Sequence, residues 1–242
     1  IVWPEAAVPV WYGQAAEYLA ALERAAREAG SALVLGVPVR DDEGNAYNAV
    51  ISLSEPPTFY YKRHLVPFGE YVPLRGLIGP ALDILGAPMS DFAPGTEARL
   101  LRAAGIPVGA FICYEAAFGA EVADLLPEAR LLINLSNDAW FGDSLGPQQH
   151  LQIARMRAIE TERPLLRATN TGITAVIDHE GQVLERAPQF EVAAITAEVM
   201  PREEATPYMR WRDWPVLGVS VGLLLYLALR RTRGGRRASG KR

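Results

Sequence analysis

The chain contains 242 residues, of which 50% are hydrophobic and 21% are charged, so it is not a disordered chain and it suits one large α/β domain. Its net charge of −4 is unevenly distributed, because residues 230–242 hold six arginines, one lysine and no acid, whereas the remainder has 17 basic and 28 acidic side chains. An acidic body of this kind argues against a nucleic-acid partner.

Helices and strands alternate in the predicted order of elements. An amphipathic helix over 11–29 closes at Gly30, and further helices are predicted over 115–126 and 148–162. Apolar runs predict strands at 32–39, 46–53, 59–61, 131–135, 165–169, 174–178, 183–186 and 193–199, with two more inside 99–112. This alternation, with hairpins at both ends, predicts a mixed sheet with helices on its faces.

Between residues 67 and 94 the periodic pattern fails. The segment is hydrophobic, yet it is punctuated by proline and glycine. A long irregular segment of this kind is typical of a lid or a binding loop, whereas the alternative is a surface loop that covers the core. Its content of Leu, Ile and Met favours a lid over an apolar ligand or a lipid.

The C-terminal end combines an apolar run with a basic tail. Residues 216–229 follow Trp211 and Trp214 and precede the arginines of the tail. As a helix these 14 residues span ~21 Å, less than the ~30 Å of a hydrocarbon core, so their length alone favours a buried core helix. The tryptophans, the arginines and the terminal position favour instead a membrane-anchoring transmembrane helix over 211–230. The positive-inside rule then places the basic tail, 231–242, in the cytoplasm and the acidic body on the outer side.

Cys113 is the only cysteine, so it cannot form an intrachain disulfide. Its remaining roles are inert core residue, metal ligand or nucleophile. It falls at a predicted strand-to-helix junction, where free amide groups and the helix dipole favour a thiolate. Because His64, His150 and His179 show no metal-ligand spacing, the sequence predicts no metal site.

Two charged residues stand at the ends of predicted strands. Glu5 follows Pro4 at the end of the apolar N-terminal run, where a buried carboxylate needs a partner or a function. Lys62 comes directly after a strand rich in aromatic residues. Most lysines are merely solvated, so each signal is weak by itself.

Taken together, these residues resemble a known family. PEAAVP with Glu5, YYKRHLVPFGEYVP with Lys62, and ICYEAAF with Cys113 resemble the Glu–Lys–Cys triad of the carbon–nitrogen hydrolase (nitrilase) superfamily. More narrowly, HLVPFGEYVP, LLINLSNDAWFG and RMRAIETERPLLRATNTGIT resemble the apolipoprotein N-acyltransferases of the bacterial envelope, and YMRWRDWP is similar to that family's ending. The resemblance runs from about residue 1 to 230. The chain begins IVWPEAAVP, so we expect a fragment that the family's N-terminal transmembrane bundle precedes.

The resemblance implies a four-layer α-β-β-α sandwich with a catalytic domain over 1–210. It implies transfer of a fatty acyl chain from a phospholipid to the α-amino group of an apolipoprotein's diacylglyceryl-cysteine, without a cofactor. It also implies a location at the bacterial inner membrane, with the catalytic domain on the periplasmic side.

The resemblance assigns roles to the three triad residues. Cys113 attacks the ester and holds the acyl group as a thioester. Glu5 takes the proton of the thiol and later that of the amine, while Lys62 holds positive charge beside the thiolate and the oxyanion.

Supporting roles are expected for Glu70, Tyr114, Glu115, Trp140 and Phe141. Glu70 and Glu115 would orient Lys62 or the incoming amine, or would alternatively form ion pairs with Arg63, Arg75 or Arg155. Trp140 and Phe141 would help the lid to exclude water. The polar side chains expected only to satisfy loops and turns are Asn134, Asn137, Asp138 and Asn170.

Two other functions remain open at this stage. One is an amidase or carbamoylase that uses the same triad with water as the second nucleophile, although such an enzyme needs no C-terminal apolar helix. The other is a non-catalytic, membrane-tethered binding module, against which the intact Glu5, Lys62 and Cys113 argue.

Overall fold

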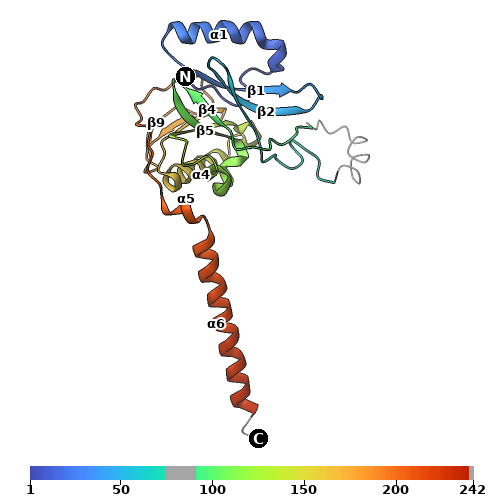
Figure 1. Cartoon of the computed structure of the whole chain (residues 1–242), viewed down its shortest axis with the longest axis vertical. Coiled ribbons are helices and arrows are strands. Elements are labelled where there is room, and N and C mark those ends of the chain that lie inside the picture. The colour runs from blue at the N-terminus through green and yellow to red at the C-terminus, as the bar shows by residue number, and fades with distance from the viewer. Residues whose placement is uncertain (75–90, 240–242) are drawn as a thin grey trace.

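A computed structural model describes residues 1–74 and 91–239, with side chains described as far as Arg230, and within this part the strands form two sheets (Figure 1). The first is an antiparallel meander in the order β1-β2-β3. The second has the order β4-β5-β6-β7-β8-β9, in which β5, β6 and β7 run parallel and the other neighbours are antiparallel. The strands are β1 (Leu33–Arg40), β2 (Ala46–Leu53), β3 (Thr58–Tyr61), β4 (Leu100–Ala103), β5 (Ile106–Ile112), β6 (Leu131–Asn137), β7 (Leu165–Asn170), β8 (Ala175–Ile177) and β9 (Val183–Arg186).

The helical segments lie outside the sheets or connect their strands. Several connections are single turns of 3₁₀-helix, including the two that follow β5 and β6. The described segments are η1 (Tyr12–Ala15), α1 (Ala16–Glu28), η2 (Cys113–Ala117), α3 (Gly119–Ala123), η3 (Asp138–Phe141), α4 (Gly146–Thr161), α5 (Pro207–Trp211) and α6 (Trp214–Ser239).

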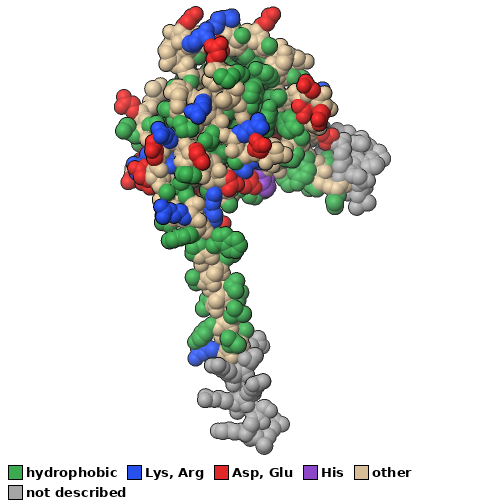
Figure 2. Space-filling model, viewed as in Figure 1, with side chains coloured by type: hydrophobic (Ala, Val, Ile, Leu, Met, Phe, Trp, Pro, Cys, Tyr) green, Lys and Arg blue, Asp and Glu red, His purple; other side chains and the backbone are tan. Residues whose placement is uncertain are grey.

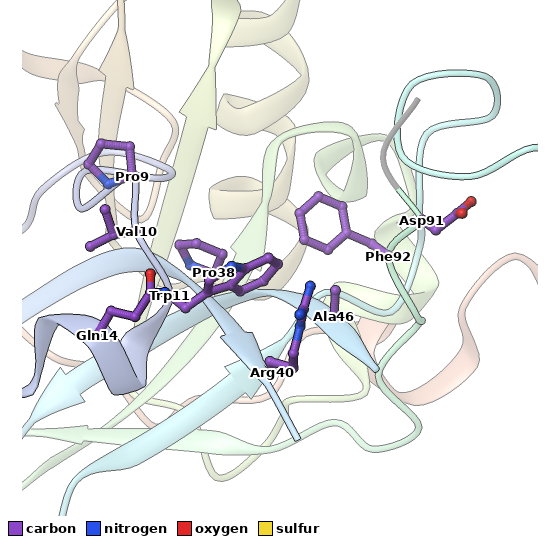
Figure 3. Close-up of a pocket in the computed structure, with 9 residues that line it drawn as sticks. All are labelled: Pro9, Val10, Trp11, Gln14, Pro38, Arg40, Ala46, Asp91 and Phe92. Atoms are coloured by element: carbon purple, nitrogen blue, oxygen red, sulfur yellow. The ribbon is translucent and has the colours of Figure 1, made fainter. Parts of the chain in front are cut away.

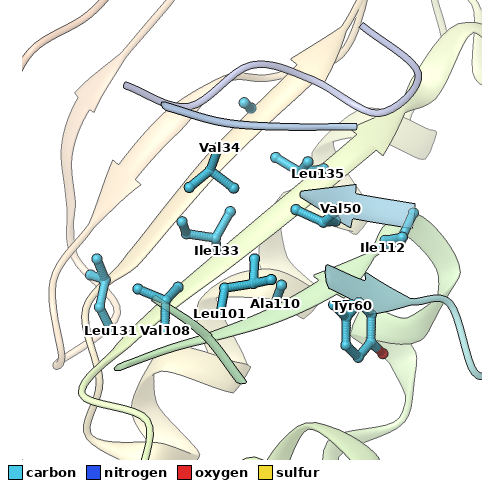
Figure 4. Packing of buried hydrophobic residues seen from close by; sticks show 11 residues of the cluster. Val34, Val50, Tyr60, Leu101, Val108, Ala110, Ile112, Leu131, Ile133 and Leu135 are labelled. Atoms are coloured by element: carbon cyan, nitrogen blue, oxygen red, sulfur yellow. The ribbon is translucent and has the colours of Figure 1, made fainter. Parts of the chain in front are cut away.

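Hydrophobic contacts hold these elements together in four layers, in the order helix, sheet, sheet and helix. Because successive residues of a strand point to opposite faces, β1 contributes Val34 to one layer of the core and Leu35 to another. Leu35 packs with α1 on the outer face of the first sheet. Val34 lies between the sheets, where it belongs to the same cluster as Ile133 of β6 (Figure 4). Leu151 of α4 packs on the other face of the second sheet.

Most predicted helices and strands lie within two residues of the observed ones, but two expectations were wrong. The helix predicted over 115–126 is divided into η2 and α3, because Phe118 leaves the helical region at φ −105° and ψ 77°. Gly119 then packs so closely that an added Cβ would meet Arg157 at 2.7 Å. The strand predicted over 193–199 is not formed, and its side chains are mostly exposed.

The expected transmembrane helix over 211–230 requires a correction. In the figures α6 extends away from the sheets, and its apolar side chains from Val216 to Leu229 are exposed (Figures 1 and 2). Among the described residues, however, no helix combines the length and the apolar character needed to cross a membrane. The apolar run is interrupted by Arg230 after ~21 Å of helix.

The close crossing of the N-terminal segment over β1 generates a prediction about stability. A Cβ added to Gly36 would lie 2.5 Å from the backbone nitrogen of Ala6 and 2.7 Å from the Cα of Glu5. Because both are backbone atoms, Gly36→Ala should displace the segment and lower the free energy of unfolding by about 1–3 kcal/mol. Gly13→Ala is the matched control, since no atom lies within 4 Å of its added Cβ. Equal stabilities of the two variants in chemical denaturation would contradict this reading of the crossing.

Candidate active site

A cavity of about 880 Å³ contains all three residues of the predicted triad, Glu5, Lys62 and Cys113. Cys113 follows β5 and Asn137 ends β6, and the two strands are parallel, so their carboxyl ends meet at one edge of the second sheet. Lys62 follows β3 of the first sheet. The cavity therefore opens where strand ends from both sheets converge.

A buried ammonium group lies between two carboxylates on one side of this cavity. Lys62, whose side chain is 1% exposed, places its Nζ atom 2.8 Å from the Glu70 carboxylate and 4.0 Å from Glu5 Oε1. The Nδ2 group of Asn48 donates to Glu5 at 2.7 Å and to Glu70 at 2.9 Å. The backbone nitrogen of Asn137 donates to the other oxygen of Glu5 at 2.7 Å. Glu70 is therefore in direct contact with Lys62.

Burial and neighbouring charges shift the pKa values of the three predicted triad residues. It raises the pKa of Glu5, although Lys62 and Asn48 oppose the shift. It would lower the pKa of Lys62, but the charges of Glu5 and Glu70 outweigh it and the pKa lies above its ordinary value. Burial and the charge of Glu5 raise the pKa of the Cys113 thiol more than Lys62 lowers it. Burial therefore outweighs the effect of the strand–helix junction, which was expected to favour a thiolate, and the thiol needs a base to remove its proton.

Cys113 itself has an unusual backbone conformation. Its φ of 48° lies in the left-handed region, which costs a non-glycine residue on the order of 1 kcal/mol. The strained residue lies at the abrupt change from β5 to the 3₁₀-helix η2. Such a turn projects the side chain from the strand end, and the cavity is lined by this residue.

Glu115 is buried behind the cavity and does not line it. Its carboxylate accepts hydrogen bonds from the backbone nitrogens of Arg63, His64 and Ile112, at 2.6, 3.1 and 2.7 Å, and from the hydroxyl of Tyr60 at 2.8 Å. The carboxylate thus fixes the residues next to Lys62 and next to Cys113 relative to one another. Of the expected ion-pair partners, Arg63 meets Glu115 through its backbone, and Arg75 lies outside the described residues.

Exposed aromatic side chains surround the mouth of the cavity. Trp140 is 80% exposed, and Phe68, Tyr114 and Phe141 are also exposed while lining the cavity. From the segment predicted to be a lid, residues 67–70 and 92 line the cavity, whereas residues 75–90 lie outside the described part of the chain. The described wall is thus predominantly apolar and aromatic.

Figure 3 shows the residues that line a second cavity, of about 510 Å³. The two share Pro9, Pro38 and Phe92 among their lining residues. In the second cavity the guanidinium group of Arg40 lies 4.4 Å from the ring centroid of Trp11, within the range of a cation–π contact.

Sequence reasoning missed a polar network directly behind the thiol. Ligand-type atoms of Cys113, Asp138 and His150 lie within 4.8 Å of one another, although the histidines showed no metal-ligand spacing. Asp138 was expected to serve only its loop. Instead its oxygens accept from Ser136 at 2.7 Å, from Arg167 at 2.8 Å and from the His150 ring at 2.9 Å. Because three donors already bind the Asp138 carboxylate, its oxygens are not free to coordinate a metal ion. The positive charge of Arg167 would also repel a divalent cation at this position.

One sequence signal points to this network in retrospect. Arg167 lies inside a predicted buried strand, where a cation requires a counter-ion. Asn170 was likewise underrated, because its Nδ2 group donates to the backbone oxygen of Glu5 at 2.7 Å. Glu5 is thereby held at both its side chain and its backbone.

Comparison with known proteins supports the predicted resemblance. The chain is 49% identical to the apolipoprotein N-acyltransferase of Methylococcus capsulatus, with 100% of this chain and 48% of that protein aligned. It is 46% identical to the enzyme of the same name from Azotobacter vinelandii, with 99% and 47% aligned. The chain therefore spans about half the length of these curated relatives.

Solved structures share the fold at low sequence identity. A carbon-nitrogen hydrolase from Helicobacter pylori matches with a TM-score of 0.58 at 17% identity, over 75% of this chain and 66% of that one. A nitrilase-superfamily amidase of Nesterenkonia matches with a TM-score of 0.55 at 22% identity, over 77% and 72%. Residues 1–208 match the family described as carbon-nitrogen hydrolase. The chain belongs to the carbon-nitrogen hydrolase family.

Proposed function

We propose that this chain is the acyl-transferring part of an apolipoprotein N-acyltransferase. It would move a fatty acyl group from a phospholipid to the α-amino group of an apolipoprotein's diacylglyceryl-cysteine. The observation that carries the proposal is the convergence of Glu5, Lys62 and Cys113 in one cavity with a largely apolar wall. Relatives named apolipoprotein N-acyltransferase, 43–49% identical along nearly the whole chain, support transfer to an amine over hydrolysis.

The first half-reaction forms a thioester. Glu5 accepts the proton of the Cys113 thiol, and the sulfur attacks the ester carbonyl of the phospholipid. Lys62 stabilises the negative charge that develops on the carbonyl oxygen. When the ester bond breaks, Glu5 returns the proton to the leaving alkoxide, so that lysophospholipid departs and the acyl group stays on the sulfur.

The second half-reaction moves the acyl group to nitrogen. The amine of the acceptor attacks the thioester carbonyl, Glu5 takes a proton from the attacking nitrogen, and Lys62 again stabilises the oxyanion. The carbon–sulfur bond breaks, an amide forms, and Glu5 returns the proton to Cys113. Water competes with the amine, so the aromatic residues at the mouth, Trp140 and Phe141 among them, are assigned to excluding it.

The remaining assignments concern the membrane. We place residues 1–210 as the catalytic domain, on the periplasmic side of the bacterial inner membrane. Residues 211–230 are assigned to membrane anchoring, which the exposed apolar side chains of α6 support.

If Cys113 is the nucleophile, replacing its sulfur should nearly abolish formation of the N-acylated peptide. With phospholipid and a diacylated lipopeptide in detergent, the wild-type chain should yield N-acylated peptide, and Cys113→Ser should lower the rate by ~10³-fold or more. Mass spectrometry of the peptide measures the product. Release of free fatty acid without N-acylated peptide would instead identify a hydrolase.

The charge of Lys62 predicts a second loss of activity. Lys62→Met nearly keeps the volume of the side chain but removes the cation, so the rate of acyl transfer should fall ~10²–10³-fold while the fold is retained. Circular dichroism checks the fold. Arg24→Met, which removes an exposed cation from α1, should leave the rate unchanged. Near-normal transfer by the Lys62 variant would refute its assigned role.

The raised pKa of Glu5 predicts the acid side of the pH–rate profile. Glu5 must be ionised to accept a proton, so the rate of acylation should fall as pH drops through a pKa above the usual glutamate value of 4.5. The hydrogen bond from Asn48 lowers that pKa. Asn48→Ala should therefore shift the acid limb to higher pH. If the acid limb of Asn48→Ala lies at the same pH as that of the wild-type chain, a group other than Glu5 sets it.

A further inference from the structure

The ring of His150 lies between two oxygen atoms. This residue lies in the first turns of α4 and is 7% exposed. Its Nδ1 atom is 2.9 Å from Oδ1 of Asp138, and its Nε2 atom is 3.0 Å from the backbone oxygen of Cys113. A neutral imidazole carries one N–H group and can therefore donate to only one of these oxygens.

Neither partner of His150 has a proton to offer. The backbone oxygen of Cys113 is only an acceptor. Asp138 receives Arg167 and Ser136 as donors. Burial would raise the pKa of Asp138, but the hydrogen bond from His150 and the charge of Arg167 outweigh it, so the pKa lies below its usual value. A ring that faces two acceptors satisfies both only as an imidazolium.

The site around Asp138 is built into the fold. Arg167 is 2% exposed and also hydrogen-bonds to Asn134. A Cβ at Gly172 would lie 2.3 Å from Oδ2 of Asp138, so this position must lack a side chain for the carboxylate to fit. Among the described residues, the ring of His150 meets the carboxylate of Asp138 in η3 and lies near the Cys113 thiol of η2, and Arg167 of β7 lies behind Asp138.

A positive charge at His150 would balance the charges of the cavity. Glu5, Lys62 and Glu70 together carry a net charge of −1 when all three are ionised, and this opposes a second negative charge on sulfur. Asp138 and Arg167 cancel each other, so an imidazolium at His150 adds +1 within 4.8 Å of the Cys113 sulfur. After the thiol proton passes to Glu5, the whole cluster is neutral.

We propose that His150 is a positioning residue for the nucleophile: as an imidazolium it holds the backbone oxygen of Cys113 and stabilises negative charge on the sulfur. The hydrogen bond fixes the strained residue, whose φ is 48°. The charge compensates the excess of carboxylates on the other side of the cavity. This inference deepens the proposed function, because it rests on Cys113 as the nucleophile.

The protonation of His150 is measured directly on the wild-type chain. ¹⁵N NMR spectra of the imidazole side chains, recorded on the chain in detergent at pH 7.5, should show both ring nitrogens of His150 bearing protons. The signals are assigned by their loss in His150→Gln, or by selective labelling if that variant does not fold. One unprotonated ring nitrogen at this pH would overturn the proposal.

The effect on the sulfur is measured by alkylation of Cys113 with iodoacetamide as a function of pH. In His150→Gln the amide can still donate to the backbone oxygen of Cys113 but carries no charge. The apparent pKa of the thiol should rise by about one unit, which slows alkylation about tenfold at neutral pH. His179→Gln, in the turn between β8 and β9, is the matched control and should alkylate like wild type.

An alkylation profile of His150→Gln identical to that of wild type would overturn the charge role. A merely structural role of His150 would lower stability without moving the apparent pKa of the thiol. Neither measurement uses a lipid or an amine. A chain that alkylates as expected but fails to transfer acyl groups would therefore contradict the proposed function and leave the role of His150 intact.

Discussion

The ammonium group of Lys62, buried between the carboxylates of Glu5 and Glu70, is the interaction on which the candidate site depends. A buried cation is stable only if it is paired, and here two acids and a shared donor, Asn48, surround it. Burial disfavours the ionised forms of these groups, and it also raises the pKa of the Cys113 thiol. A neutral thiol beside a carboxylate of raised pKa is the arrangement that a proton transfer requires.

The fold holds this cluster by fixing backbone from several distant segments. Gly36 allows the segment that carries Glu5 to cross β1 at close range. Glu115 ties the residues after Lys62 to the strand end before Cys113. Each of these contacts joins segments far apart in the sequence, so the geometry of the site is a property of the two packed sheets and not of any single loop.

Much of the fold was predictable, because the apolar periodicity of the strands reflects which faces are buried. The positions of Cys113 and Lys62 after predicted strands were weak signals by themselves, and the two residues were singled out through the motifs that resemble the carbon–nitrogen hydrolase superfamily. The pKa of the Cys113 thiol could not be predicted, because the sequence shows a strand–helix junction, which favours a thiolate, but does not show the burial that outweighs it. His150 was missed because its partners, Asp138 and the backbone of Cys113, lie on other elements, and no local spacing encodes their contact.

The central claim is that the sulfur of Cys113 carries the acyl group between donor and acceptor. The most direct measurement is the intact mass of the chain after incubation with a phospholipid of known acyl composition, with the amine acceptor withheld. We expect the chain to gain one acyl group, located at Cys113 and removed by neutral hydroxylamine, as a thioester requires. An unmodified chain, or an acyl group at another residue, would contradict it.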